Sequence, residues 1–315
     1  DVAQKFLDGQ ETPTARPAYL NVRNALHMEN VASNALVALY TFDEGSGSVV
    51  HDVSGYGTAY DLTIEHPNNV TWGAGSLSIN SPTVIKGNLA ADKINAACVN
   101  SNELTIEAWI TPANDIQDGP ARIVTLSADQ YNRNFTLGQE WDEYIARLRT
   151  TGADANGMPE AWSGQWQPIT TALTHVVFTH QSNGDEFFFL DGAHVEDMWR
   201  GGDFSNWSNG FQLALGNELT QDRPWLGELH TVAIYCDALS QLDVLEHYVQ
   251  GPDSSAQHVM PNMLLAKMAM IAYWASQNGD ETIDWSAVNW NSVNWNSVNW
   301  NSVNWNSVNW NSVNW

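Results

Sequence analysis

Short runs rich in β-branched and aromatic residues recur between residues 35 and 235, and clusters of Gly, Asn, Asp and Ser separate them. Runs of this length, divided by turn residues at such spacing, are typical of antiparallel strands in two packed sheets. The sequence therefore predicts an all-β antiparallel sandwich. The predicted strands are Ala35 to Phe42, Ser76 to Ile79, Leu104 to Thr111, Ile123 to Ser127, Asn134 to Gly138, Glu143 to Arg149, His175 to Gln181, Glu186 to Leu190, Phe211 to Gly216 and Gly227 to Tyr235.

Two local signals add detail to this pattern. Asp191-Gly192 predicts the tip of a hairpin that leads from the strand ending at Leu190 into His194-Val195, because this dipeptide accepts the positive φ angles of a tight turn. Ser240 to Tyr248 reads as a short helix, which Gly251-Pro252 should stop.

Several motifs within this region keep a characteristic order and spacing. They are ALVALYTFDEGSG followed by HDVSGYG, then LTIEAWITP, then THVVFTH followed by EFFFLDG, and finally WLGELHTVAIYCDALS. Together they resemble the LamG-like, concanavalin A-like domains of secreted bacterial proteins. The resemblance spans about residues 35 to 250 and implies a jelly-roll sandwich.

The resemblance also implies one structural calcium ion near the first and last strands, held by carboxylate and backbone oxygens. Asp52 of HDVSG and Glu228 of GELH are the side chains expected to bind it. Backbone oxygens of the loops at residues 43–47 or 54–57 would complete the site. The alternative, a loop carboxylate and a surface glutamate without metal, stays open.

The segments outside this domain have distinct compositions. Residues 1 to 34 read as an extended arm with one short helix, and residues 251 to 284 as a linker followed by an apolar helix. That helix is too short to span a bilayer comfortably. It is expected to pack on its own domain or between neighbouring subunits, with Met263, Met268 and Met270 as adaptable contacts.

Residues 285 to 315 form a tail in which NSVNW recurs. A five-residue period distributes Trp around a helix and sends successive Trp to opposite faces of a strand, so neither element gains one apolar face. We favour an extended strand with repeated docking points over a small β-solenoid or a disordered tail. The docking residues would be Trp285, Trp290, Trp295, Trp300, Trp305, Trp310 and Trp315.

The charge balance narrows the range of partners. The chain has 12 Lys and Arg residues against 36 Asp and Glu residues, a formal charge of −24. Nucleic acid and anionic membranes are therefore unlikely partners, whereas sugars, cations and polar protein surfaces fit. The chain begins at Asp1 without an apolar leader, from which we expect a processed, extracellular protein.

Two kinds of modification are consistent with an oxidising compartment. Cys98 and Cys236 are a candidate disulfide, with two separate buried thiols as the alternative. The triplets that begin at Asn69, Asn134 and Asn206 match the acceptor for N-glycosylation.

A catalytic site is not predicted. Glycosidases of this superfamily carry carboxylates on one strand as Glu-x-Asp-x-x-Glu, and Glu140-Trp141-Asp142 begins that pattern, but Ile145 stands where the acid should be. For sugar binding, Trp faces in loop-like segments are the candidates, with core packing as the alternative. They are Trp162, Trp166, Trp199 and Trp207.

Two functions from different classes remain. The first is a non-enzymatic subunit that assembles with copies of itself into an extracellular filament or surface layer, using the terminal segments as connectors. The alternative is a carbohydrate-binding or adhesin module of a larger secreted protein. The extra segments at both ends favour assembly.

Overall fold

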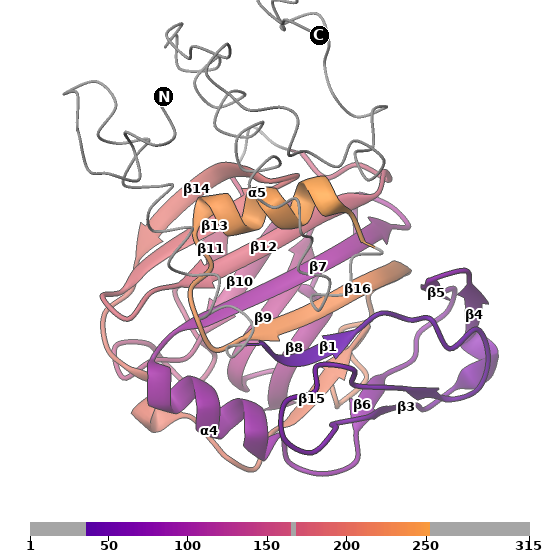
Figure 1. Cartoon of the computed structure of the whole chain (residues 1–315), viewed down its shortest axis with the longest axis horizontal. Helices are drawn as coiled ribbons and strands as arrows, with labels where there is room; N and C mark the ends of the chain where they lie inside the picture. Colours follow the sequence, from indigo (N-terminus) through magenta and orange to yellow (C-terminus); the bar gives the residue numbers. More distant parts are fainter. Residues whose placement is uncertain (1–35, 165–167, 253–315) are drawn as a thin grey trace, which may run out of the picture. The chain divides into compact units, whose positions relative to one another are not determined.

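The computed structural model describes residues 36–164 and 168–252, which form a sandwich of two antiparallel sheets (Figure 1). We call the two layers sheet A and sheet B. Sheet A contains, in spatial order, β14 (Ala193–Trp199), β13 (Asp185–Leu190), β12 (Thr174–His180), β7 (Leu104–Pro112), β16 (Gly227–Tyr235), β5 (Ser76–Ile79) and β4 (Val70–Gly73), with β1 (Leu36–Tyr40) also paired to β16.

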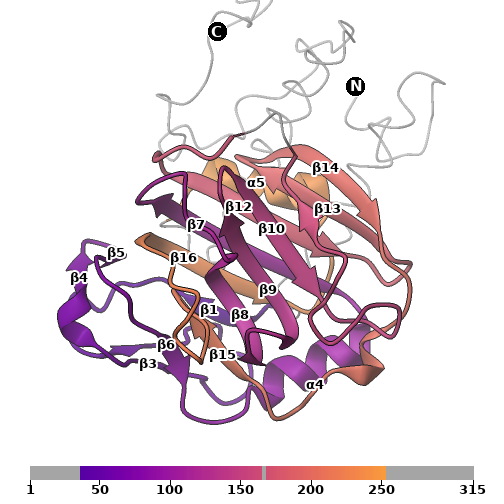
Figure 2. The same ribbon diagram turned by 180° about the vertical axis from the view of Figure 1, so that it is seen from behind.

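Sheet B is the second layer, and Figure 2 shows its strands β8, β9 and β10 side by side. Its spatial order is β11 (Ala161–Trp162), β10 (Glu143–Leu148), β9 (Asn132–Glu140), β8 (Ala121–Asp129), β15 (Gln212–Leu215), β6 (Ile85–Gly87), β3 (Leu62–Ile64) and β2 (Val49–Val50). Two short 3-10 turns, η1 (Pro67–Asn69) and η2 (Phe204–Asn206), lie in the connections.

The core lies between the sheets and follows from the alternation of side chains along each strand. Ile106 and Ala108 of β7 and Leu126 of β8 belong to one fully buried apolar cluster, together with Phe135 and Leu137 of β9. Burial of each such large apolar side chain contributes about 1.5–3 kcal/mol. The predicted all-β jelly-roll sandwich is confirmed.

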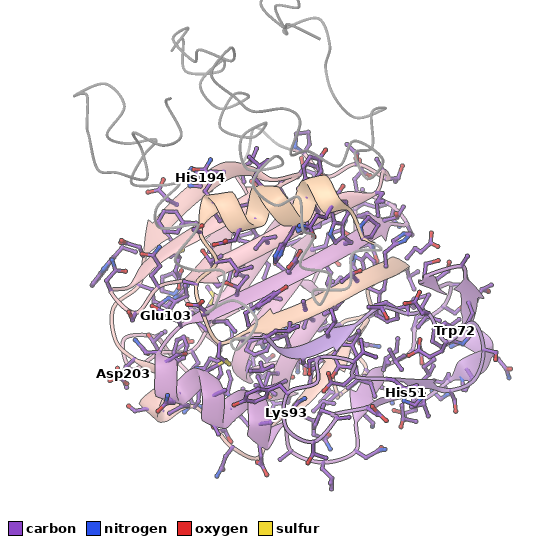
Figure 3. The ribbon with its side chains drawn as sticks, in the orientation of Figure 1. His51, Trp72, Lys93, Glu103, His194 and Asp203 are labelled. Atoms are coloured by element: carbon purple, nitrogen blue, oxygen red, sulfur yellow. A yellow bond between two sulfur atoms is a disulfide. The ribbon has the colours of Figure 1, made fainter. Side chains whose placement is uncertain are left out.

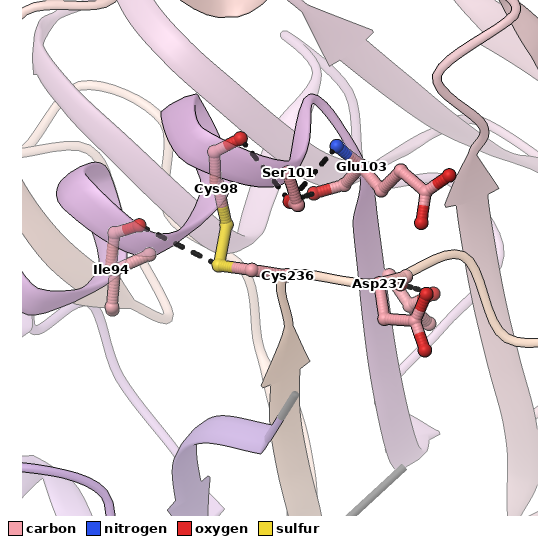
Figure 4. The surroundings of a disulfide bond; sticks show 7 residues. Ile94, Cys98, Ser101, Glu103, Cys236 and Asp237 are labelled. Carbon is pink, nitrogen blue, oxygen red and sulfur yellow. Dashed lines mark hydrogen bonds between the residues drawn. A yellow bond between two sulfur atoms is a disulfide. The ribbon is translucent and has the colours of Figure 1, made fainter. Parts of the chain in front are cut away.

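Helix α4 (Asp92–Ser101) joins β6 to β7 and is fastened by the disulfide between Cys98 and Cys236 (Figure 4). Cys236 directly follows β16, so the bond ties the helix to the last strand of the sandwich. The two cysteines are 138 residues apart, and closure of so long a loop restricts the unfolded chain strongly. The candidate disulfide is therefore present.

Helix α5 (Gln241–Gln250) crosses the outer face of sheet A (Figure 1). Ser240 caps its first turn through a reciprocal pair of hydrogen bonds with Asp243. Val244 packs in a second apolar cluster on this face, and His247 Nδ1 lies 2.9 Å from Glu107 Oε2 of β7. Sheet A is thus covered on both faces near its centre.

Most predicted strands match observed strands within two residues, and the hairpin at Asp191-Gly192 joins β13 to β14 as predicted. The helix predicted for Ser240 to Tyr248 is α5. Helix α4 and the short strands β2, β3, β4, β6 and β11 were not predicted. The predicted arm, apolar helix and repeat tail lie outside the described residues.

Within residues 36–164 and 168–252, neither α4 nor α5 combines the length and the apolar character that a bilayer span requires.

Candidate functional site

A strained and exposed tryptophan marks one end of sheet B. Trp141 forms the tip of the β9–β10 hairpin with Asp142, where Glu140 pairs with Glu143. Its φ is +56°, in the left-handed region that a bulky side chain rarely adopts, and its side chain is 55% exposed. This conformation costs about 1–2 kcal/mol. Strain retained at an exposed aromatic residue points to a binding role.

A buried amide holds this tip in place. Gln139, two residues before Trp141, is fully buried. Its Nε2 donates to the carbonyl oxygens of Trp141 at 3.0 Å and Asn114 at 2.8 Å. Its Oε1 accepts from Gln117 Nε2 and from Trp225 Nε1, both at 3.1 Å. The network joins three loops that are distant in sequence, so it fixes the backbone that carries the indole of Trp141.

The neighbouring loops complete the fastening of the tip. The backbone N–H of Trp141 donates to the carbonyl of Gln117 at 2.7 Å, and the N–H of Ile169 donates to the carbonyl of Asp142 at 2.8 Å. Ile116, beside Gln117, is exposed. The hairpin tip and the loop that leads into β8 thus offer apolar surface on a rigid frame.

Carboxylates flank the indole on both sides in the sequence. Burial, and then the charge of Glu160, raises the pKa of Glu140, and burial together with Asp142 raises the pKa of Glu143. Glu140 Oε2 is buried and has no hydrogen-bond partner. An aromatic face beside carboxylate acceptors can stack on a sugar ring and accept hydrogen bonds from its hydroxyl groups.

The structure separates the tryptophans predicted to bind sugar. Trp199, at the end of β14, is 67% exposed, and its Nε1 donates to the carbonyl of Asn183. Trp162 is half-buried and lines a pocket with Glu186 and Met198 that has room for about one water molecule. That space is too small for a sugar ring.

Trp207 requires a correction. It is only 8% exposed, stacks on Phe204 at a ring distance of 4.5 Å, and donates from Nε1 to the carbonyl of Arg149. It is a core residue, because the connection between β14 and β15 packs its aromatic side chains into the main apolar cluster. Trp166 lies outside the described residues.

A second charged cluster, on β8, β9 and the loop after β15, is closed to solvent. The carboxylate of Glu218 lies 3.1 Å from Arg122 Nε and 3.9 Å from Arg133 Nη1, and all three side chains are fully buried. Burial, and then the charge of Arg122, lowers the pKa of Arg133 to about 9. The cluster links neighbouring strands of sheet B and offers no surface to a ligand.

The two predicted calcium ligands contact different groups. Asp52 accepts hydrogen bonds from the backbone N–H groups of Leu39, Ser54 and Tyr60, whereas Glu228 accepts one from Ser76 Oγ at 2.6 Å. In the part of the chain that the structure describes, no three His, Cys, Asp or Glu side chains gather as metal ligands would.

The candidate glycosylation sites also differ from one another. Asn134 is fully buried, and its amide exchanges hydrogen bonds of 2.9 Å with the backbone of Ser208 in both directions, so the prediction for Asn134 is wrong. Asn69 and Asn206 are half-buried and stay predictions. The predicted assembly residues, from Met263 to Trp315, lie outside the described residues.

The fold and the sequence together define the class of protein. A profile of the concanavalin A-like lectin/glucanases superfamily matches residues 86–245, just over half of the chain, and the chain belongs to this superfamily. The part of the predicted resemblance that concerns the domain is thereby confirmed. No curated protein matches the chain.

Solved structures with a similar fold include receptor-binding parts of botulinum neurotoxins. The serotype D/C binding domain has a TM-score of 0.50 at 10% identity, with 69% of this chain and 52% of that chain covered. The neurotoxin DC binding domain in complex with rat synaptotagmin II has a TM-score of 0.51 at 10% identity, again with 69% of this chain and 52% of that chain covered. A type C neurotoxin, whose cell entry is described as dependent on interaction with two ganglioside molecules, has a TM-score of 0.51 at 10% identity, with 70% of this chain and 52% of that chain covered.

This chain therefore spans about half the length of those toxin chains, and at such identities the likeness shows the fold alone. The superfamily name joins lectins with glucanases, so membership leaves the prediction of a non-enzymatic protein as a prediction.

Proposed function

We propose that the domain is a carbohydrate-binding module and that the hairpin tip around Trp141 is its binding site. The observation that carries this proposal is an exposed indole kept in a strained conformation by the buried Gln139 network. This favours the alternative function of the sequence analysis over self-assembly. The superfamily includes lectins, which is consistent with the proposal.

The charge around the tip selects the class of glycan. Glu140, Asp142 and Glu143 are the nearest acidic residues to Trp141 in the sequence, and the whole chain carries a formal charge of −24. Acidic sugars would bring like charges together, which costs free energy, whereas neutral sugars donate hydroxyl hydrogens to the carboxylates. The proposed ligand is therefore a neutral oligosaccharide.

The variant Trp141→Asn tests the site with two readouts that move in opposite directions. Loss of the indole should weaken glycan binding about tenfold. Because Asn tolerates the left-handed conformation, the free energy of unfolding should rise by about 0.5–1 kcal/mol. A glycan array with neutral and sialylated members identifies the ligand, calorimetric titration gives its affinity, and urea denaturation gives the stability.

Trp199→Ala is the control, because it removes an indole that is also well exposed, at 67% against 55%, from an edge strand of the other sheet. Its affinity should equal that of the unmodified chain. Unchanged binding in Trp141→Asn, or a loss of binding in Trp199→Ala instead, would refute the assignment.

Self-assembly remains a second proposal, supported by the position of β14. This strand is the last in the order of sheet A, and most of its side chains are exposed. An edge strand leaves backbone groups available for a further strand, although Glu196 and Asp197 place charge there. The proposed assembly adds the repeat tail of another subunit to such an edge.

A further inference from the structure

The ammonium group of Lys93 occupies a cluster of oxygen atoms beside the first strand. Lys93 lies in the first turn of α4, at the right-hand end of this helix in Figure 3. Its Nζ contacts Asp52 Oδ2 very closely, donates to the carbonyl of Tyr56 at 2.9 Å and reaches Ser54 Oγ at 3.4 Å. Each of its three N–H donors thus has one oxygen acceptor.

The oxygen atoms around Lys93 are of the types that bind calcium in proteins. One carboxylate, one hydroxyl and one backbone carbonyl come from Asp52 and from the loop at residues 54–57, where the calcium ligands were expected. Calcium takes 6–8 oxygen ligands at about 2.3–2.6 Å. With the ammonium among these oxygens, calcium would meet a like charge and too few ligands, so the residues present do not fit the ion.

Both carboxylate oxygens of Asp52 also accept hydrogen bonds from the backbone. Its Oδ1 accepts from the N–H groups of Leu39 and Ser54 at 3.2 and 3.0 Å, and its Oδ2 accepts from the N–H of Tyr60 at 2.9 Å. Burial raises the pKa of Asp52, but the hydrogen bonds from Lys93, Tyr60 and Ser54 outweigh this effect and lower it. The carboxylate is therefore ionised and fully satisfied within the protein.

The place of Lys93 in its helix supports a specific role. A cation in the first turn is disfavoured by the helix dipole, and no side chain caps the N-terminus of α4. The side chains of Lys93 and Asp52 are 12% and 0% exposed, so this is a buried pair rather than a surface contact. The benefit of Lys93 thus comes from the loop that it binds.

We propose that Lys93 is a built-in cation that replaces structural calcium in this domain. It neutralises Asp52 and ties the loop after β2 to α4, which the Cys98–Cys236 disulfide anchors at its other end. The domain therefore folds at full stability without calcium, and the first strand stays in place when calcium is low.

The test uses the full chain and two matched lysine variants. In Lys93→Met, the buried carboxylate loses its partner, and the melting temperature should fall by on the order of 10 °C. In Lys86→Met, which breaks an exposed pair with Glu65 at 3.1 Å, it should change by less than about 2 °C. For the unmodified chain, the melting temperature should be the same in millimolar calcium and in excess chelator.

Calorimetric titration of the unmodified chain with calcium does not depend on the folding of any variant. It should show no stoichiometric heat of binding. A stoichiometric heat, or a melting temperature that falls in chelator, would overturn the proposal. A melting temperature of Lys93→Met equal to that of Lys86→Met would overturn it as well.

Discussion

Single residues whose surroundings conflict with their ordinary preferences carry much of what is specific to this domain. Trp141 adopts a conformation suited to Asn or Gly, and Lys93 is a cation at the start of a helix. A third case is the pair of carboxyl groups of Glu103 and Asp237, which share a hydrogen bond. Both residues lie near the disulfide (Figure 4). In each case a local cost is offset by a contact from elsewhere in the fold.

The Glu103–Asp237 pair predicts a dependence of stability on pH. Burial, and then the hydrogen bond and charge of Glu103, raises the pKa of Asp237 to about 6. In the unfolded chain such a carboxyl ionises near pH 4, so its stabilising effect is present below about pH 4 and is lost as the pH rises to about 6. Asp237→Asn keeps a donor to Glu103 at every pH. Its free energy of unfolding, measured by urea denaturation, should exceed that of the unmodified chain by about 1 kcal/mol at pH 7 and equal it near pH 4.

Asp197→Asn, on the exposed strand β14, serves as the control and should follow the unmodified chain at both pH values. If Asp237→Asn differs from the unmodified chain by the same amount at pH 4 and pH 7, the two carboxyl groups do not share a proton.

At this scale the sequence predicted residue types better than their surroundings. The tip Glu140-Trp141-Asp142 was considered as the start of a glycosidase motif. Only its place at a two-residue turn whose first residue has a positive φ, where Gly would be expected, could have singled it out. Trp207 was a candidate for sugar binding with core packing as the alternative, and it packs against Phe204 and Phe135. Local composition does not report such long-range packing.

The elements differ in how clearly the sequence encodes them. The long strands are rich in β-branched and aromatic residues and were predicted to within two residues of their ends, whereas α4 has only Ile94 and Cys98 buried on its inner face. The apolar residues of α4 are spread around the helix and only two of the ten positions are buried, so the sequence gives no readable helical period. The short strands of sheet B are defined by their partners, and no local pattern marks a strand of two or three residues.

Neighbouring elements of sheet B depend on the buried Glu218. Glu218→Gln would leave Arg122 and Arg133 buried without a carboxylate, and the free energy of unfolding should fall by about 3–5 kcal/mol. Arg133→Met should lower the free energy of unfolding by less, because the guanidinium of Arg122 still pairs with the carboxylate of Glu218. Chemical denaturation of both variants measures the difference.

Glu65→Gln is the control, since Glu65 pairs with Lys86 where both side chains are about one-third exposed, at 33% and 31%. It should change stability by less than about 1 kcal/mol. Equal losses in Glu65→Gln and Glu218→Gln would contradict the buried network.

For the whole molecule, the order of motifs along the chain was enough to identify the fold, because order and spacing encode the topology of the sandwich. The proposed binding site was not predictable in the same way. It depends on hydrogen bonds such as that from Gln117 Nε2 to the carbonyl of Leu226, across 109 positions in the sequence. The roles of the terminal segments, which lie outside the described residues, stay predictions.

Removal of residues 285 to 315 tests assembly separately from glycan binding. The compact unit at residues 30–257 has its own core, so the shortened chain should keep its melting temperature and its affinity for glycan. If the tail docks on another subunit, the particle mass from light scattering should fall to that of one chain. Filaments that persist unaltered in electron micrographs would exclude the tail as a connector.

The pairing of β1 with β16 determines how the domain responds to mechanical force. Leu36 lies opposite Tyr235, so a pull through both ends of the domain peels this strand pair apart one hydrogen bond at a time. The tension then reaches Cys98 and Cys236, and the covalent bond between them carries it directly. The residues between the two cysteines, which include the tip at Trp141, lie outside the covalent path of the force, so the proposed site is shielded from tension while the strands before Cys98 are pulled away.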